Sequence, residues 1–479
     1  MPTTACKKKL YALNPAQPPQ FLTVQRTRRK ERSAPSDPKS LERQVRQLLA
    51  DKISGNQVGI WLLVPEHLRL GTWDLLLRWT GQPAERVEPR MALHLVHEAA
   101  LCLCSFRQGR TLSQKGFELA NGLPFVPTDQ AMHDLLDAHT VEQAQHLQIA
   151  LGKLRRASQH FTGPVLAMDP HRMTSHTKRL MRRHRFSAQE KPTKMGQTFF
   201  LLDTQTGQPI CFTLASSAPS VVQASPDLLR MAAEILSLPS EPAAKPLVLA
   251  DKEHFSQQLF TFVREQGCFD LLCPVPAFPY SLKRWGQIPA QDFTPQWPGY
   301  ATTTQPYRFE DDPTGLCYEM VQRNGGTRKD FLFQGFVSTV ARPEMPTLTR
   351  DYPRRWHVEE FFKFNQALGW HRTGTLNLNV RYGQMSMALL AQAAIHQFRG
   401  RMGQPMIQWE AEHLAQHVFQ GLEGDVRVRK DTIIVTFYNA PNANLLRAHY
   451  ENLPEKLQRE GVDPHIPWLY NFKLNFRFK

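Results

Sequence analysis

The chain has 479 residues, 41% of them hydrophobic and 10% aromatic, which is enough to bury large cores and excludes a disordered chain. Its 58 Lys and Arg residues outnumber 43 Asp and Glu residues, so a polyanionic partner is expected, either nucleic acid or an anionic membrane surface. No apolar run approaches the ~18–20 residues of a membrane span, and the N-terminus lacks the apolar stretch of a signal peptide. We therefore expect a cytoplasmic protein that binds nucleic acid and no membrane.

The first 160 residues divide into a basic arm and a helical region. Residues 1–40 carry clustered Lys and Arg interrupted by prolines, without helical or strand periodicity, and predict a flexible arm that either contacts DNA or only aids solubility. From 41 to 160, five segments space apolar residues three and four apart, and Thr128 and Thr140 stand where helix N-caps belong. We interpret 41–160 as a helical DNA-binding domain, although no pattern identifies a helix that would enter a groove.

Residues 161–277 alternate strands and helices, which predicts the first part of a mixed α/β core. The apolar segment PVLAMD ends in Asp169, and QTFFLLD and PICFTLA predict a hairpin around Gly207. After a helix at 226–238, a second apolar segment, PLVLAD, ends in Asp251. A carboxylate at the end of a buried strand opens at the sheet edge, where a ligand can bind, so two such strands would place two carboxylates side by side.

The remaining chain holds an insertion, two helices and a C-terminal segment. Residues 278–350 predict a small β-rich insertion with a hairpin turn at Asn324-Gly325-Gly326. Residues 351–400 return to the core with two helices, the second a long apolar one from about Met385. Residues 401–479 predict a last α/β segment with the strands DVRVR and TIIVTFYNA.

The stretch 351–372 predicts one amphipathic helix, with Asp351 as N-cap and Pro353 in the first turn. Its polar sector holds Tyr352, Arg355, Glu359 and Gln366, and its apolar side holds Val358, Phe361, Phe362, Phe364 and Leu368. Taken alone, Glu359 beside Arg355 is typical of a solvated ion pair.

Asp169, Asp251 and Glu359 together favour a metal site, since each aspartate alone is more typical of a turn or helix cap. Carboxylates are hard oxygen ligands that suit Mg²⁺ or Mn²⁺. Two such ions would clamp the attacking and leaving oxygens of an in-line phosphoryl transfer, without a covalent protein–DNA intermediate.

In the order of its elements the chain resembles the DDE transposases of bacterial insertion sequences, in particular the group with a Tyr-Arg-Glu-Lys signature. The resemblance rests on the two aspartate-ended strands, the β-rich insertion and the motif Tyr352-x-x-Arg355-x-x-x-Glu359, and it covers roughly residues 160–400. It implies an RNase H-like core that cuts the ends of a mobile element and joins them to target DNA. It also implies a bacterial, nucleoid-associated protein that acts on DNA as a homodimer.

Carried over residue by residue, the resemblance makes Asp169, Asp251 and Glu359 the ligands of two Mg²⁺ ions, with Mn²⁺ as a substitute. Tyr352 and Arg355 would contact phosphates of the element end. The lysine of the signature falls at Gln366, so Lys363 is the substitute, unless it only pairs with Glu359. The basic run at 178–185 suits a DNA backbone track or a solvated helix face, and its candidate contacts are Lys178, Arg179, Arg182 and Arg183. In the family an aromatic residue of the insertion can stack on a flipped base, and Trp285 and Trp297 are the candidates here, although most tryptophans belong to the core.

Two alternatives stay open at this point. A related nuclease would hydrolyse DNA without strand transfer and would keep the three acids without recognising element ends. A catalytically idle DNA-binding derivative is the other, and the intact acidic triad argues against it.

Overall fold

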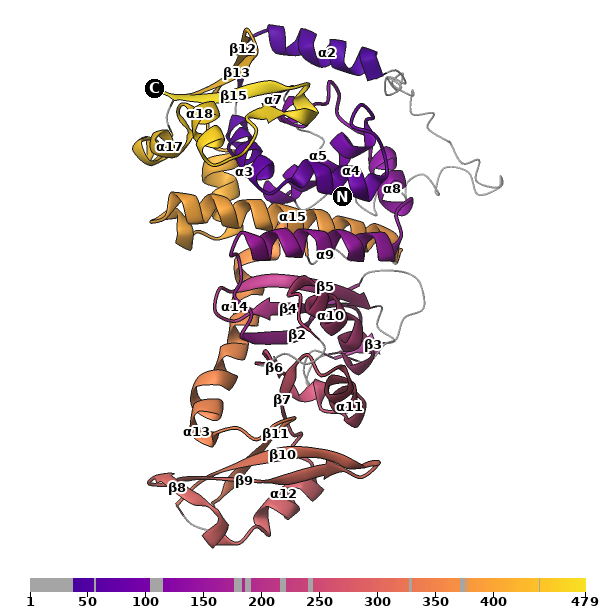
Figure 1. The fold of residues 1–479 in the computed structure, drawn as a ribbon, viewed down its shortest axis with the longest axis vertical. Helices are drawn as coiled ribbons and strands as arrows, with labels where there is room; N and C mark the ends of the chain where they lie inside the picture. The colour runs from indigo at the N-terminus through magenta and orange to yellow at the C-terminus, as the bar shows by residue number, and fades with distance from the viewer. Residues whose placement is uncertain are drawn as a thin grey trace, which may run out of the picture.

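A computed structural model describes residues 38–55, 57–103, 115–175, 183–185, 191–215, 221–239, 244–326, 330–370, 375, 377–438 and 440–479. The fold is mixed α/β and elongated, with a helical and β lobe at one end, a large sheet in the middle and strands of the insertion at the other end (Figure 1). None of the helices in the described ranges is both long and apolar enough to cross a membrane.

The large sheet combines parallel and antiparallel strands in the order β3-β4-β2-β6-β7-β11-β10-β9-β8, with β5 paired to β4. Its strands are β2 (Val165–Thr174), β3 (Arg183–His184), β4 (Thr193–Asp203), β5 (Gln208–Ala215), β6 (Leu247–Ala250), β7 (Asp270–Pro274), β8 (Thr294–Trp297), β9 (Tyr300–Phe309), β10 (Asp312–Asn324) and β11 (Leu332–Ser338). β2, β6 and β7 are parallel neighbours. The predicted hairpin around Gly207 is confirmed as β4–β5.

Helices cover both faces of the parallel strands. Because side chains alternate along a strand, Leu166 and Met168 point to one face and Ala167 to the other. The first face packs on α10 (Val221–Ile235) and α11 (Gln257–Gln266), and α11 follows the short 3₁₀ turn η2 (Lys252–His254). The second face packs on α14 (His357–Asn365) and α15 (Leu378–Met402).

The insertion continues the large sheet. The sequence predicts its strands as a small sheet of their own, but β11 pairs antiparallel with β7, with Val337 opposite Cys273. Helix α12 (Pro279–Gly286) contacts β11, and the turn η3 (Ala290–Asp292) follows it in the chain. Trp285 is fully buried in this contact, and a Cβ at Gly335 would lie 2.3 Å from its ring, so only glycine fits there.

The two ends of the chain build one lobe around a second sheet, ordered β1-β12-β13-β15-β14. Its strands are β1 (Ile53–Gly55), β12 (Gly424–Arg429), β13 (Thr432–Phe437), β14 (His465–Ile466) and β15 (Phe472–Phe478). Its helical elements are α2 (Pro38–Ala50), η1 (Val58–Leu63), α3 (Val64–Arg69), α4 (Thr72–Thr80), α5 (Glu88–Ala100), α7 (Lys115–Ala120), α8 (Asp129–Asp137), α9 (Val141–Ala157), η7 (Met406–Gln408), α16 (Ala411–Leu414), η8 (Ala415–Phe419), α17 (Ala443–Tyr450), α18 (Leu453–Arg459) and η9 (Pro467–Leu469). Helix α15 contacts α5, α8 and α9, and therefore joins this lobe to the large sheet (Figure 1).

Local signals place several helix ends correctly. Thr128 caps α8 and Thr140 caps α9, the latter in a capping box with Gln143, as predicted. The first described helix, α2, ends at Ala50, and Ile53 enters β1. Near the C-terminus, α17 and α18 are separated at Asn452, whose φ is +55°.

The expected helix at 351–372 begins earlier and is less regular. Helical turns run from α13 (Glu344–Pro346) through the π turn η4 (Thr347–Asp351) and the 3₁₀ turn η5 (Tyr352–Trp356) into α14, and the turn η6 (Gln366–Leu368) follows α14. Asp351 is therefore inside the helical run and does not cap it. The predicted apolar side holds for Val358 and Phe361, which are buried, but Phe364 is 38% exposed.

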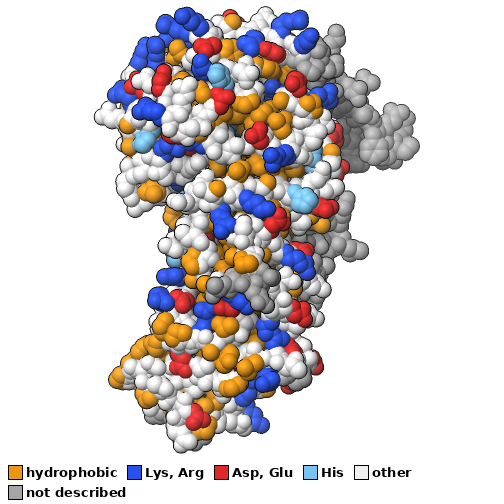
Figure 2. Space-filling model, in the orientation of Figure 1, with side chains coloured by type: hydrophobic (Ala, Val, Ile, Leu, Met, Phe, Trp, Pro, Cys, Tyr) orange, Lys and Arg blue, Asp and Glu red, His pale blue; other side chains and the backbone are white. Residues whose placement is uncertain are grey.

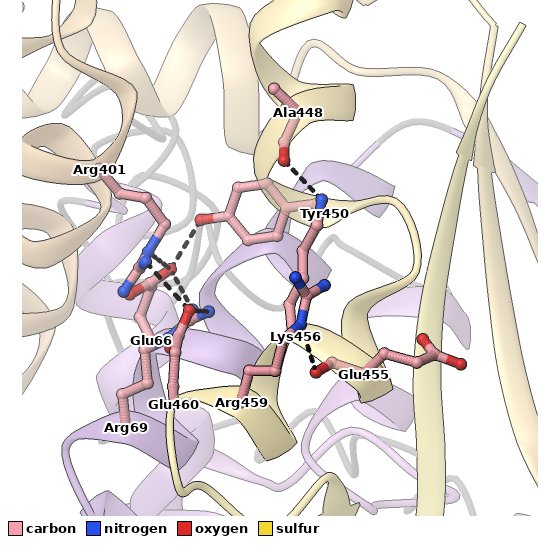
Figure 3. Close-up of polar contacts among 9 residues, drawn as sticks. All are labelled: Glu66, Arg69, Arg401, Ala448, Tyr450, Glu455, Lys456, Arg459 and Glu460. Carbon is pink, nitrogen blue, oxygen red and sulfur yellow. Dashed lines mark hydrogen bonds and ion pairs between the residues drawn. The ribbon is translucent and has the colours of Figure 1, made fainter.

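A buried polar network links three helices of the terminal lobe (Figure 3). The carboxylate of Glu66 in α3 is fully buried and accepts hydrogen bonds from Arg69 at 2.9 Å and from the Tyr450 hydroxyl of α17 at 2.7 Å. Arg401 of α15 lies 3.3 Å from the same carboxylate, and Glu460 pairs with Arg69 at 2.6 Å. The chain ends are thus joined to α15 by charge as well as by apolar packing.

Candidate active site

Asp169 and Asp251 lie side by side because β2 and β6 are parallel and in register. Met168 is opposite Ala250, so the next residue on each strand is an aspartate. Residues two apart on a strand point to the same face, so Asp169 lies on the face of Ala167 and Asp251 on the face of Leu249. This is the sheet face that α14 covers. The predicted end of this strand was wrong: β2 does not end at Asp169 but continues to Thr174, paired with β4. Only its pairing with β6 stops before Asp169, at Met168.

Glu359 and Arg355 approach these aspartates from η5 and α14, which contact β2 and β6. Arg355 bridges two of the acids, with Nη1 3.5 Å from Oδ1 of Asp169 and Nη2 3.6 Å from Oε1 of Glu359. Asp169 and Arg355 are largely buried, with side chains 15% and 13% exposed, whereas Glu359 is 47% exposed. The start of α14 is anchored by His357, whose Nδ1 lies 2.5 Å from the carbonyl oxygen of Thr204.

The site concentrates negative charge. The pKa of Asp169 is raised to about 7, mainly by burial. The charges of Asp251, Glu359 and Glu253 also act to raise it, and Arg355 acts to lower it. Burial also works against the charge of Arg355, but the surrounding carboxylates more than compensate, and its pKa is raised. A cation is therefore stabilised at this position in the fold.

A fourth carboxylate, Glu253, belongs to the site and was missed by the sequence reasoning. It lies in η2, two residues after Asp251, and forms an ion pair with Arg172 of β2. Its backbone N–H donates to the side chain of Asp251, which caps η2. The signal was available in the sequence, since Glu253 is an acid within one turn of a strand-end aspartate.

The other residues of the predicted signature differ in how far they are buried. Tyr352 is half-buried, with its ring 4.8 Å from that of Phe336 in β11, and burial raises the pKa of its hydroxyl. Lys363 is exposed on α14, and the structure pairs Glu359 with Arg355, not with Lys363. Gln366 is also exposed, in η6.

The remaining candidates divide between described and undescribed positions. Lys178, Arg179 and Arg182 lie outside the described residues, and Arg183 is exposed in β3. Trp285 donates its Nε1–H to Glu319 in the core, so it is not available to stack on a base. Trp297 is 50% exposed and stacks on Tyr300 with ring centroids 4.2 Å apart.

The candidate ligands for a divalent ion are carboxylates arranged around Arg355. Within the described ranges, no three His, Cys, Asp or Glu side chains lie close enough together to coordinate one ion, because Arg355 stands between Asp169 and Glu359. The donors themselves suit Mg²⁺ or Mn²⁺, since they are carboxylate oxygens. Burial, and to a smaller extent the neighbouring carboxylates, raise the pKa of Asp169 to about 7, and a bound cation would favour its ionised form. The ligand type at this site, carboxylate oxygen, therefore fits Mg²⁺ or Mn²⁺.

Comparison with known proteins identifies the segment that carries this site. Residues 160–393 match the family of the transposase DDE domain. The transposase DDE domain match thus includes Asp169, Asp251 and Glu359, and its limits agree with the region of resemblance expected from the sequence.

Among solved structures, the cryo-EM structure of piggyBac transposase in a synaptic complex with hairpin DNA is similar at 11% identity and a TM-score of 0.41, over 77% of this chain and 82% of that chain. A likeness this weak says nothing about individual residues. No curated protein matches the chain.

Proposed function

We propose that this protein is a DNA transposase of the DDE type that cuts the ends of a bacterial insertion element and joins them to target DNA. The observation that carries the proposal is the placement of Asp169 and Asp251 at adjacent positions of two parallel strands, facing Glu359, within the segment that matches the transposase DDE domain. The Tyr352, Arg355 and Glu359 spacing supports assignment to the group with the Tyr-Arg-Glu-Lys signature.

Asp169, Asp251 and Glu359 would hold two Mg²⁺ ions. Glu253 lies near enough for its negative charge to act on Asp169, so it would add to the attraction for these ions. Bound divalent ions would supply charge neutralisation at the scissile phosphate and a lower pKa for the attacking hydroxyl. The chain's own contribution is positional: the rigid pair β2–β6 fixes the two aspartates, and α14 delivers Glu359 to them.

Arg355 and Tyr352 would bind phosphate oxygens of the element end, together with Lys363, which lies one turn past Glu359 on α14. Arg355 has two nitrogens already directed at carboxylates, and these can exchange that contact for the bidentate contact with phosphate that guanidinium groups favour. We further propose that two copies pair the two element ends, a proposal that rests on the family resemblance alone.

The proposal is tested with the full chain, Mg²⁺ and duplex DNA that carries the flanking ends of the gene, with nicking and joining followed separately on gels. Wild type is expected to nick and join, and Glu359→Gln is expected to lose both by at least about a hundredfold, because a neutral amide is a poor metal ligand. Glu360→Gln is the matched control, since Glu360 is the exposed neighbouring acid on α14, and it should retain activity.

Three results decide between the functions. Unchanged cleavage by Glu359→Gln would remove the metal-site assignment. Cutting without joining would favour a nuclease of the same fold, and wild type that binds DNA ends without cutting them would favour an idle DNA-binding derivative.

A further inference from the structure

The outer face of the C-terminal sheet, defined by Arg427 and Arg429 of β12 and by Lys473, Asn475 and Arg477 of β15, carries aligned cations. Along β15, Phe472, Leu474, Phe476 and Phe478 are buried, and the residues between them are more exposed. Strand register places the five on one face: Arg427 is opposite Ile434 and then Asn475, and Arg429 is opposite Thr432 and then Lys473. The helices α17 and α18 pack against β15 from the lobe interior.

These cations are in excess over carboxylates. Two carboxylates lie on or beside this face. Asp425 is in the same cross-strand row as Arg477 and pairs with Lys52 at 2.9 Å, and Asp431, in the turn between β12 and β13, pairs with Lys473 at 3.0 Å. For the described part of the chain, no ion pair joins Arg427, Arg429 or Arg477 to a carboxylate. Two more exposed lysines, Lys430 and Lys479, lie at the strand ends. Figure 2 shows Lys and Arg side chains gathered at this end of the molecule.

The spacing of the array suits a polyphosphate. Alternate residues on a strand are about 7 Å apart, and β12 and β15, with β13 between them, are about 10 Å apart. The central strand contributes Ile434 and Thr436, which are only 6% and 1% exposed, so the face offers no apolar side chain that could insert into a bilayer. A flat sheet face also presents nothing that enters a groove to read base edges.

We propose that the outer sheet face binds the phosphate backbone of duplex DNA without regard to sequence. The proposal deepens the proposed function, on which it rests for the choice of DNA. In Figure 1 this sheet lies at the opposite end of the molecule from β9 and β10, with α15 and α9 between it and β2 and β6. The bound DNA is therefore a stretch away from the cleavage point, and the face acts as a second anchor.

The test measures binding of the full chain to a labelled duplex of arbitrary sequence by fluorescence anisotropy, between about 50 and 200 mM salt. The triple variant Arg427→Gln, Arg429→Gln, Arg477→Gln is expected to bind at least about tenfold more weakly for any duplex sequence. Its slope of log affinity against log salt should be shallower by about 2 to 3, because each lost phosphate contact removes about 0.9 from the slope.

Matched variants separate charge placement from net charge and from folding. Lys153→Gln, Arg230→Gln, Arg447→Gln removes three charges from exposed cations that each have a carboxylate partner, and should leave the slope unchanged. The triple Arg→Lys variant at 427, 429 and 477 should retain the slope, since lysine keeps the point charge.

Several outcomes would overturn the proposal. One is an unchanged salt slope in the Gln triple. A second is a loss of DNA affinity in the control triple or in the Lys triple that equals the loss in the Gln triple. A third is a Gln triple that loses binding to phosphatidylserine vesicles but keeps its binding to DNA. If the wild type never cleaves DNA but the Gln triple shows the shallower slope, only the proposed catalytic function is contradicted. If the wild type cleaves DNA and the Gln triple keeps the wild-type slope, only the proposed role of the outer sheet face is contradicted.

Discussion

Asp169 is held in a state that suits ligand binding and not stability. Its pKa is raised to about 7, mainly by burial, whereas an aspartate in the unfolded chain has a pKa near 3.8. The folded state therefore binds this proton more tightly than the unfolded state does, and the stability that the proton provides is lost as the pH rises from 3.8 to about 7.

We predict that Asp169→Asn is more stable than wild type at pH 8 in the presence of a chelator, because the amide removes a buried charge. The gain in melting temperature should be a few °C. Near pH 4, where the wild-type carboxyl keeps its proton, the gain should vanish. Thermal unfolding at the two pH values measures this, and equal melting temperatures at pH 8 would show that Asp169 is not destabilised by ionisation.

Arg355 occupies the position in which the acids stabilise a cation, so it competes with a divalent ion when no DNA is bound. We predict that Arg355→Gln binds Mn²⁺ more tightly than wild type without DNA, by about tenfold, which corresponds to about 1.4 kcal/mol. Titration of free Mn²⁺ by electron paramagnetic resonance measures this. Arg354→Gln, which removes the same charge one residue away, should change the affinity much less, and an equal or weaker affinity in Arg355→Gln would contradict the competition.

At the scale of elements, the turns and helices that deliver side chains depend on distant contacts. The helical run from Glu344 to Leu368 changes from a π turn to a 3₁₀ turn where Tyr352 packs against Phe336 of the insertion. An amphipathic pattern alone predicts a regular helix there, since periodicity carries no information about this contact. The cap at Thr140, by contrast, is a local interaction and is predictable.

The Glu66 network gives an element-scale prediction. Removing the buried carboxylate leaves Arg69 and Arg401 without their shared partner, so Glu66→Ala should lower the free energy of unfolding by about 3–5 kcal/mol. Denaturant unfolding measures the loss. Glu455→Ala is the control, because Glu455 is exposed at the margin of the same network, and it should change stability by less than about 0.5 kcal/mol. Similar losses in the two variants would show that the network does not hold the lobe together.

At the scale of the whole molecule, the sequence predicts the core better than its connections. The mixed α/β character follows from the alternation of apolar strand and helix patterns, and the neighbouring aspartates follow from two apolar runs that are each followed by an acid. The pairing of β1 with β12 does not, because a strand of three residues has no periodicity to detect and its partner is far along the chain. The close approach of Gly59 to Val418 cannot be predicted from the sequence either, although a Cβ at Gly59 would lie 1.9 Å from the carbonyl oxygen of Val418.

The pairing of β1 with β12 also sets an order of events during synthesis. Ser54 and Asp425, which are hydrogen-bonded at 2.6 Å, are separated by 371 positions. At translation rates of about 5–20 residues per second, the N-terminal strand waits roughly 20 to 70 seconds for its partner to leave the ribosome. During that interval the apolar faces of the first helices have no sheet to cover them, so a truncated message yields a chain that chaperones and proteases can recognise. Only a chain translated to its last strand can complete the terminal lobe.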